Sequence, residues 1–331
     1  MQDMQPLYSA ASADTIPFQP TSIAVLDEQQ LKPFSGEQRK VMVSVDIAIR
    51  GLSALLMIGL PIALGWIWAR RWGARWGVFF AGGVTFIASQ VAHIPFNTIV
   101  LNPLLTQFGW DPVGDIVARY WVAIIFGLSA GVFEEVARYI VYRWWMKDVR
   151  TWREGVFFGL GHGGVEAIIL GALAGLALYA ALAFQSTDFE TLAPDQLQAV
   201  TLQFEAYWAS PWYDVLLAVV ERIFTLMVHV SLALLVLQAF TRRNAWWLLL
   251  AVVWHALVDA VAVFGLYTWG VYWTEFAIGV LGLSSLVIVY WLRPGRTENQ
   301  KEPAVPLEPP STDTLSKADD GEVKIDDTRY A

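Results

Sequence analysis

Long apolar stretches, separated by short polar segments, dominate the chain. The first stretch, residues 51–69, contains no charged residue and is long enough to span a bilayer as a helix. The apolar residues are continuous rather than alternating, which favours membrane helices over a β-barrel. An all-α, polytopic bundle with seven membrane helices is therefore expected, at 51–69, 77–101, 119–143, 155–184, 213–240, 245–267 and 271–292. The third stretch is long, so an eighth, short or re-entrant helix stays open.

The two ends of the chain differ from its middle. Residues 1–41 form a mixed polar segment without the basic start and short apolar core of a secretory signal peptide. Residues 42–292 form the predicted membrane domain. Residues 293–331 are rich in Pro, Glu, Asp and Lys, a composition typical of disordered tails.

Composition agrees with a membrane protein and narrows its partners. Hydrophobic residues make up 56% of the chain and charged residues only 16%, too few for the surface of a soluble domain. No basic patch with interleaved aromatic residues occurs, so we expect lipids and a peptide or membrane-protein substrate as partners, and no nucleic acid. The chain has no cysteine, which excludes disulfides, thiolate metal sites and cysteine catalysis.

The charges of the connecting loops predict the orientation in the membrane. Arginine and lysine gather in three loops, at 70–75, 143–154 and 242–243. The alternate loops, at 102–118, 185–211 and 268–270, contain neither residue. Because basic loops stay in the cytosol, this integral cell membrane protein should have its N-terminus outside and its C-terminus in the cytoplasm.

Ionisable residues interrupt four of the predicted helices at similar depth. They lie roughly 10–21 Å from the cytosolic ends of their helices at the rise of an α-helix. A charge at that depth costs several kcal/mol unless it is paired or hydrated, so the set predicts a polar chamber suited to hydrolysis or transport. Three i, i+4 pairs, each on one helix face, belong to it: Glu134 with Arg138, His162 with Glu166, and His255 with Asp259. His229 is the remaining member, whereas His93 lies off the common plane and is predicted to be structural.

Three short motifs carry a resemblance to a known family. "EEVAR" (134–138), "FGLGH" (158–162) and "HALVD" (255–259) follow one another in the order of the motifs of the CAAX-prenyl-protease and bacteriocin-processing (CPBP, or Abi) superfamily of intramembrane proteases. "GLGHGGVEA" (159–167) is similar to the YhfC branch, which is grouped with PrsW-type intramembrane metalloproteases. Two residues, not three, separate the glutamate pair from Arg138, as in PrsW-like proteins with lysine there. This departure counts against a prenylated substrate.

The resemblance implies an intramembrane endopeptidase that activates water with glutamate and histidine. Glu134 would be the base, with Arg138 as its neighbour one turn away, and His162 would hold the same water. His255, oriented by Asp259, would donate to the oxyanion. Glu135 is the second carboxylate of the motif, although it points about 100° away around the helix.

A metal-dependent mechanism stays open beside the glutamate mechanism. His162, His229 and His255, with Glu134 or Glu166, could bind Zn²⁺ in an open catalytic site. The chain has no HExxH helix signature, and the sequence does not decide between the two mechanisms.

Two other functions compete with the protease. Buried Glu, His and Asp also form proton relays in transporters, although the chain shows no inverted repeat and no paired broken helices. A non-catalytic membrane scaffold or immunity protein would keep the same constellation without turnover.

Overall fold

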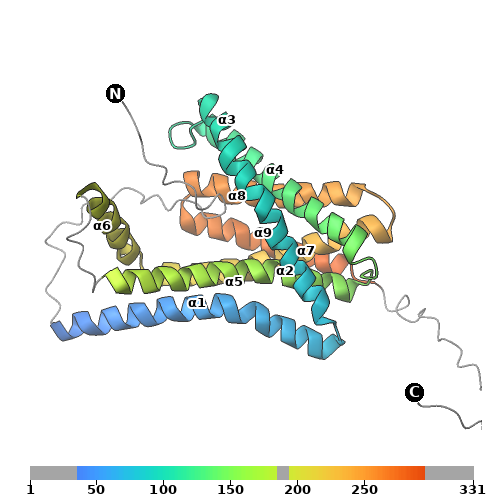
Figure 1. Ribbon diagram of the computed structural model, residues 1–331, viewed down its shortest axis with the longest axis horizontal. Coiled ribbons are helices and arrows are strands. Elements are labelled where there is room, and N and C mark those ends of the chain that lie inside the picture. The colour runs from blue at the N-terminus through green and yellow to red at the C-terminus, as the bar shows by residue number, and fades with distance from the viewer. Residues whose placement is uncertain (1–35, 185–193, 295–331) are drawn as a thin grey trace, which may run out of the picture. The chain divides into compact units, whose positions relative to one another are not determined.

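The computed structural model describes residues 36–184 and 194–294, and all regular structure in these two ranges is helical (Figure 1). Most of the predicted N-terminal segment and of the predicted disordered tail lies outside the described residues. The helices are α1 (Gly36–Trp72), α2 (Trp76–Pro95), the π-helical η2 (Phe96–Leu101), α3 (Asn102–Gln107), α4 (Ile116–Ile140), the π-helical η3 (Val141–Trp145), α5 (Trp152–Phe184), α6 (Pro194–Ala209), α7 (Trp212–Thr241), α8 (Trp246–Thr268) and α9 (Val271–Trp291).

Seven helical spans in the described ranges are long and apolar enough to cross a membrane, which confirms the predicted fold class. They are Ser44–Trp72, Trp76–Gln107, Ile116–Trp145, Trp152–Phe184, Trp212–Thr241, Trp246–Thr268 and Val271–Trp291. An additional helix, α6, precedes the fifth span and does not belong to the third stretch, where the sequence left room for one.

A change of helix type shapes the second span. Pro95 lies inside the helical run and has no backbone N–H to donate, so it interrupts the regular α-helical hydrogen bonds. The π-helical turn η2 follows directly, and the chain then continues as α3 within the same span. Turns of this kind often accompany functional sites, and here the turn carries Asn97, which is buried.

Helix α7 is the most buried element of the bundle. Every residue from Val228 to Leu237 is buried, and the helix packs against α1, α4, α5, α8 and α9. A helix that is apolar all round belongs in the interior. His229 lies in this buried segment, so its imidazole depends on neighbouring side chains for hydrogen bonds.

Glycines let α2 and α5 touch backbone to backbone. A Cβ atom on Gly82 would overlap the carbonyl of Phe158, and one on Gly161 would overlap the carbonyl of Phe79. Figure 1 shows α2 running across α5 at this level rather than alongside it. The crossing fixes His162, which follows Gly161 directly, against α2, and its ring lies 5.3 Å from that of Phe86.

Basic loops and loops without Lys or Arg lie at opposite ends of the first span, as their charges suggest. After its end, Arg75 pairs with Asp148 at 2.6 Å and with Glu154 at 3.1 Å, which joins two basic loops. The Arg75 guanidinium also holds the pKa of Asp148 below its usual range. Near the start of the span, Arg50 donates to the carbonyl of Ser210 at 2.7 Å, so the loop after α6 lies at the other end.

Candidate functional site

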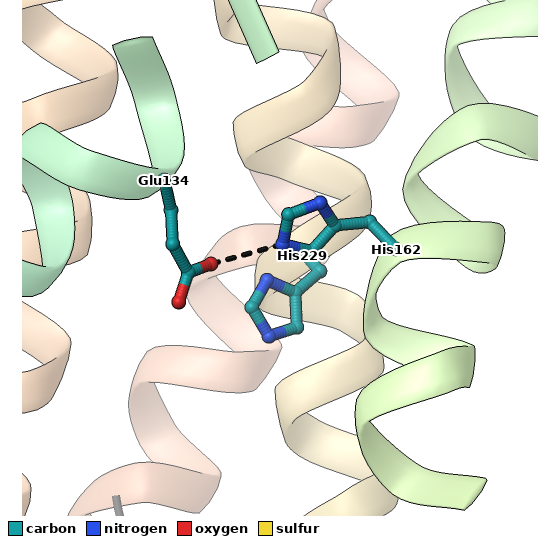
Figure 2. A group of neighbouring side chains, drawn as sticks. All are labelled: Glu134, His162 and His229. Atoms are coloured by element: carbon teal, nitrogen blue, oxygen red, sulfur yellow. Dashed lines mark hydrogen bonds and ion pairs between the residues drawn. The ribbon is translucent and has the colours of Figure 1, made fainter. Parts of the chain in front are cut away.

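The centre of the site is a buried group of one carboxylate and two imidazoles. Glu134 of α4, His162 of α5 and His229 of α7 each offer a ligand atom, and these three atoms lie within 4.8 Å of one another. Glu134 Oε2 lies 2.9 Å from His162 Nε2 (Figure 2). Figure 2 shows the three side chains pointing toward one another from three separate helices. Residues far apart in the sequence thus meet because their helices pack at one level.

Two neighbours determine the tautomer of His229. Arg138 Nη2 lies 2.8 Å from Nδ1 of the ring, and an arginine can only donate, so Nδ1 accepts. The ring proton is then on Nε2, which donates to Glu166 Oε2 at 2.5 Å. Glu166 also accepts from Arg222 at 2.5 Å. A metal ion can therefore bind this ring only if Arg138 leaves Nδ1 or Glu166 leaves Nε2.

Arg138 is fully buried and links both glutamates of the motif. Its guanidinium forms ion pairs with Glu135 and, at 3.3 Å, with Glu134. A buried guanidinium in a membrane span requires such partners, because an unpaired charge there is strongly destabilising. The adjacent glutamates therefore hold the arginine in the core, and the arginine spaces the carboxylate of Glu134 from the ring of His229.

His255 of α8 is held by a carboxylate other than the expected one. The i, i+4 spacing suggested Asp259 as its orienting partner, but His255 Nδ1 lies 2.6 Å from Glu135 Oε1. Asp259 Oδ2 lies 3.6 Å from Nε2, which is too far for a direct hydrogen bond. Glu135 therefore orients the ring, while Asp259 stays partly exposed beside its other nitrogen.

The expected pairing of His162 with Glu166 also differs from the structure. His162 turns to Glu134 on α4, and Glu166 turns to His229 and Arg222 on α7. The candidate residues of the sequence are nevertheless connected by contacts, and the rings of His229 and His255 lie 5.9 Å apart. Their catalytic and metal-binding roles stay predictions.

A row of polar side chains ends at Glu134, and the sequence singled out only one of them, His93, as a structural residue. Gln90 of α2 donates to Glu134 Oε1 at 3.0 Å. His93 Nδ1 lies 3.2 Å from Gln90 Oε1, and Asn97 Nδ2 lies 2.9 Å from His93 Nε2. Ser129 of α4 donates to Asn97 Oδ1 at 2.8 Å.

This row, the α2 polar ladder (Gln90, His93, Asn97 and Ser129), has a single direction. An amide N–H₂ only donates and an amide oxygen only accepts, so every bond donates toward the carboxylate of Glu134. Aligned bonds of this kind polarise one another. The i, i+3, i+7 spacing of Gln90, His93 and Asn97 was the available sequence signal, because it places all three on one face of a helix.

The site lies at a cavity of about 660 Å³. Its polar lining includes Glu134, His229, His255, Asp259 and the ladder residue Gln90. Apolar side chains from α2, α5 and α8 form much of the remaining wall. A cavity of this size can hold several residues of a peptide beside the carboxylates and imidazoles.

Seven apolar spans around a buried carboxylate and imidazole group define an integral membrane protein with a candidate metal centre in its core. Comparison with known proteins agrees. Residues 56–282 match the family that is described as YhfC intramembrane metalloprotease. A relative from Bacillus subtilis (strain 168), described as the uncharacterized membrane protein YhfC, is 34% identical over 259 residues, which cover 76% of this chain and 97% of the relative. The chain therefore belongs to the YhfC family. No solved structure matches it.

Proposed function

We propose that the protein is a metal-dependent intramembrane peptidase that hydrolyses peptide bonds of membrane-associated substrates. The observation that carries this proposal is the buried group of Glu134, His162 and His229 beside a cavity within the membrane spans. The name of the family supports the same reaction class. The order of the three motifs further suggests kinship with the CPBP and PrsW-type proteases.

The donor set fits a catalytic metal ion. One carboxylate and two imidazoles are a known ligand set of catalytic zinc sites, which keep a further position open for water or substrate. A zinc ion bound there would lower the pKa of its water and polarise the scissile carbonyl. In the described part of the chain, Nδ1 of His162 is buried without a hydrogen-bond partner, so this ring can turn toward a ligand without breaking a bond at that atom.

The remaining polar residues have roles that follow from their places. Glu166 accepts the Nε2 proton of His229 and so leaves Nδ1 as the ligand atom, provided that Arg138 moves off it. Arg138 can then donate to the developing oxyanion. Asp259, which lines the cavity, would take the proton of the attacking water and give it to the leaving amine, with His255, held by Glu135, beside it. In the glutamate mechanism, Glu134 itself would be the base.

The test combines metal content with cleavage in membranes. Wild type, Glu134→Gln and Glu275→Gln are purified and analysed for bound metal, and membranes of expressing cells are searched for new peptide termini. Glu275 is a matched control because it is a glutamate inside a span that lines a different cavity. We expect bound zinc and new termini with wild type and with Glu275→Gln, and loss of both with Glu134→Gln. New termini that persist in Glu134→Gln would contradict the proposal, and cleavage without metal would favour the glutamate mechanism.

Proton-coupled transport is a second candidate, favoured by the unbroken contacts that connect the site. Hydrogen bonds and ion pairs lead from Ser129 through the ladder to Glu134 and Arg138, and onward to His229 and Glu166. Arg138 keeps its proton, so protons would pass between the buried carboxylates and imidazoles through water in the cavity. Proteoliposomes that acidify in a Glu134-dependent manner, without any new peptide termini, would support transport instead of proteolysis.

A further inference from the structure

The cavity of the site extends to the lipid-facing surface. Among the residues that line it, Val91 of α2 is 71% exposed and Leu173 of α5 is 48% exposed. Ile87 and Ile169, which also line it, are exposed on the same two helices. A side chain that lines a cavity and is also exposed marks where that cavity meets its surroundings. We call these four residues, Ile87, Val91, Ile169 and Leu173, the α2–α5 lips.

The geometry of the two helices explains why an opening forms there. Both α2 and α5 begin at the end of the bundle that carries the ion pairs of Arg75. They touch backbone to backbone at Gly82 and Gly161, and because α2 runs across α5, they diverge beyond this point (Figure 1). All four lips follow the crossing in sequence on their helices. The opening is thus a wedge whose narrow end is held by the glycine contact.

The narrow end of the wedge coincides with the reactive group. His162 follows Gly161, and its Nε2 lies 2.9 Å from Glu134 Oε2. Gln90, between the lips Ile87 and Val91 in sequence, faces inward and donates to the same carboxylate. A segment that slides between the lips would therefore meet the site within the membrane, without first passing through water.

We propose that the α2–α5 lips admit the substrate sideways from the bilayer and that this substrate is an apolar membrane-embedded segment of a protein. Val91 and Leu173 lie near the middle of their spans, Trp76–Gln107 and Trp152–Phe184, where the surroundings are hydrocarbon. The lips are aliphatic, so they match apolar side chains of the segment. The polar groups behind them can bind the backbone N–H and C=O groups that an unwound segment exposes and that lipid cannot satisfy.

This inference rests on the proposed peptidase function, and the absence of cysteine from the chain makes it testable. Val91→Cys introduces the sole thiol, which a bulky methanethiosulfonate reagent modifies reversibly. Val84→Cys is the matched control, because Val84 is 49% exposed on the same helix and does not line the cavity. The probes are a reconstituted membrane protein with a mapped Glu134-dependent cleavage site, and a short water-soluble peptide that covers the same bond.

Modification at Val91 should lower the ratio of the two cleavage rates, membrane protein over short peptide, by about tenfold or more, the effect of blocking one route of access. Reductant should restore the ratio, and modification at Val84 should leave it unchanged. An unchanged ratio at Val91 would overturn the lateral route while leaving the peptidase function intact. Absence of Glu134-dependent cleavage of both probes by wild type would instead overturn the proposed function, and the lateral route with it.

Protection of the lips by a bound substrate gives a second test, which does not require cleavage. In the Glu134→Gln background, the reconstituted membrane protein should slow the reaction of Val91→Cys with N-ethylmaleimide and leave that of Val84→Cys unchanged. Equal reaction rates at Val91→Cys with and without the membrane protein would contradict the lips as its binding place.

Discussion

At the scale of single residues, the site is a set of charges that balance one another in the absence of bulk water. Arg138 faces Glu134 and Glu135, and Arg222 faces Glu166 and Glu221. Each histidine of the site touches one of these carboxylates. Removing a single member leaves its partner buried and unpaired, which is why substitutions at the site need controls for folding.

The α2 polar ladder leads to a prediction about Gln90. Replacing Gln90 by leucine removes the donor to Glu134 Oε1 and detaches the ladder from the carboxylate. Partners that orient a metal ligand typically contribute 10–100-fold to metal affinity, so we expect Gln90→Leu to weaken zinc binding by about that factor. Chelator competition on the purified protein measures it.

Gln107→Leu is the control for this experiment, because Gln107 is an exposed glutamine at the end of the same span. Its zinc affinity should equal that of wild type. If Gln90→Leu unfolds at the same temperature as wild type and binds zinc equally well, the ladder has no part in positioning Glu134.

The sequence predicted which residue types gather at the site, but not which of them pair. Spacing along one helix predicted that His255 pairs with Asp259 and His162 with Glu166, because residues four apart share a face. In the structure both rings turn to carboxylates on other helices, Glu135 and Glu134. Spacing determines neighbours within a helix, whereas the rotation of each helix in the bundle depends on packing between helices. Gln90 and Asn97 were overlooked for the same reason, because uncharged amides gain their role only from what they face.

At the scale of the helices, close approach of α2 and α5 holds the reactive group in place, and it depends on Gly161. In Gly161→Leu, the new side chain would clash with the backbone carbonyl of Phe79 and push the two helices apart. Overpacking of this kind typically costs about 1–3 kcal/mol, so the unfolding temperature in detergent should fall. Zinc binding should weaken with it, because His162 moves with the helix.

Gly59→Ala is the matched control, since a Cβ atom at Gly59 of α1 meets no atom within 4 Å. Alanine is the better helix former, so this variant should unfold at or slightly above the temperature of wild type. A Gly161→Leu protein with the stability of wild type would show that the backbone contact is not required.

The helices themselves were predictable because length and apolarity alone decide whether a segment can span a bilayer. All seven expected stretches are spans, although several are longer than their apolar cores; the first runs from Ser44 to Trp72. The π-helical turn after Pro95 and the short helix α6 were not predicted. A proline indicates an interruption but not how the chain continues, and α6 is too polar to register as an apolar stretch.

At the scale of the whole membrane domain, orientation is the property that loop charge predicts and that folding alone does not determine. The structure joins the loops of Arg75 and Asp148 at one end of the bundle and places Ser210 near Arg50 at the other. Loops of like charge character therefore share an end, as a single orientation requires. Which end faces the cytosol is decided in the cell, because loops rich in Lys and Arg are kept on the cytosolic side while the helices are inserted into the membrane.

We predict that the end with the basic loops is cytosolic. A reporter fused after Arg243 should be active only as a cytosolic reporter, and one inserted near Asp195 only as an external one, because the loops 185–211 and 268–270 carry no Lys or Arg. Replacing Arg242 and Arg243 by glutamine alone should leave the pattern unchanged, since the loops at 70–75 and 143–154 keep the remaining bias. A cytosolic reporter at Asp195 together with an external one after Arg243 would reverse the orientation. The α2–α5 lips would still open to hydrocarbon in that case, because Val91 lies at the middle of its span, so the lateral route does not depend on the orientation.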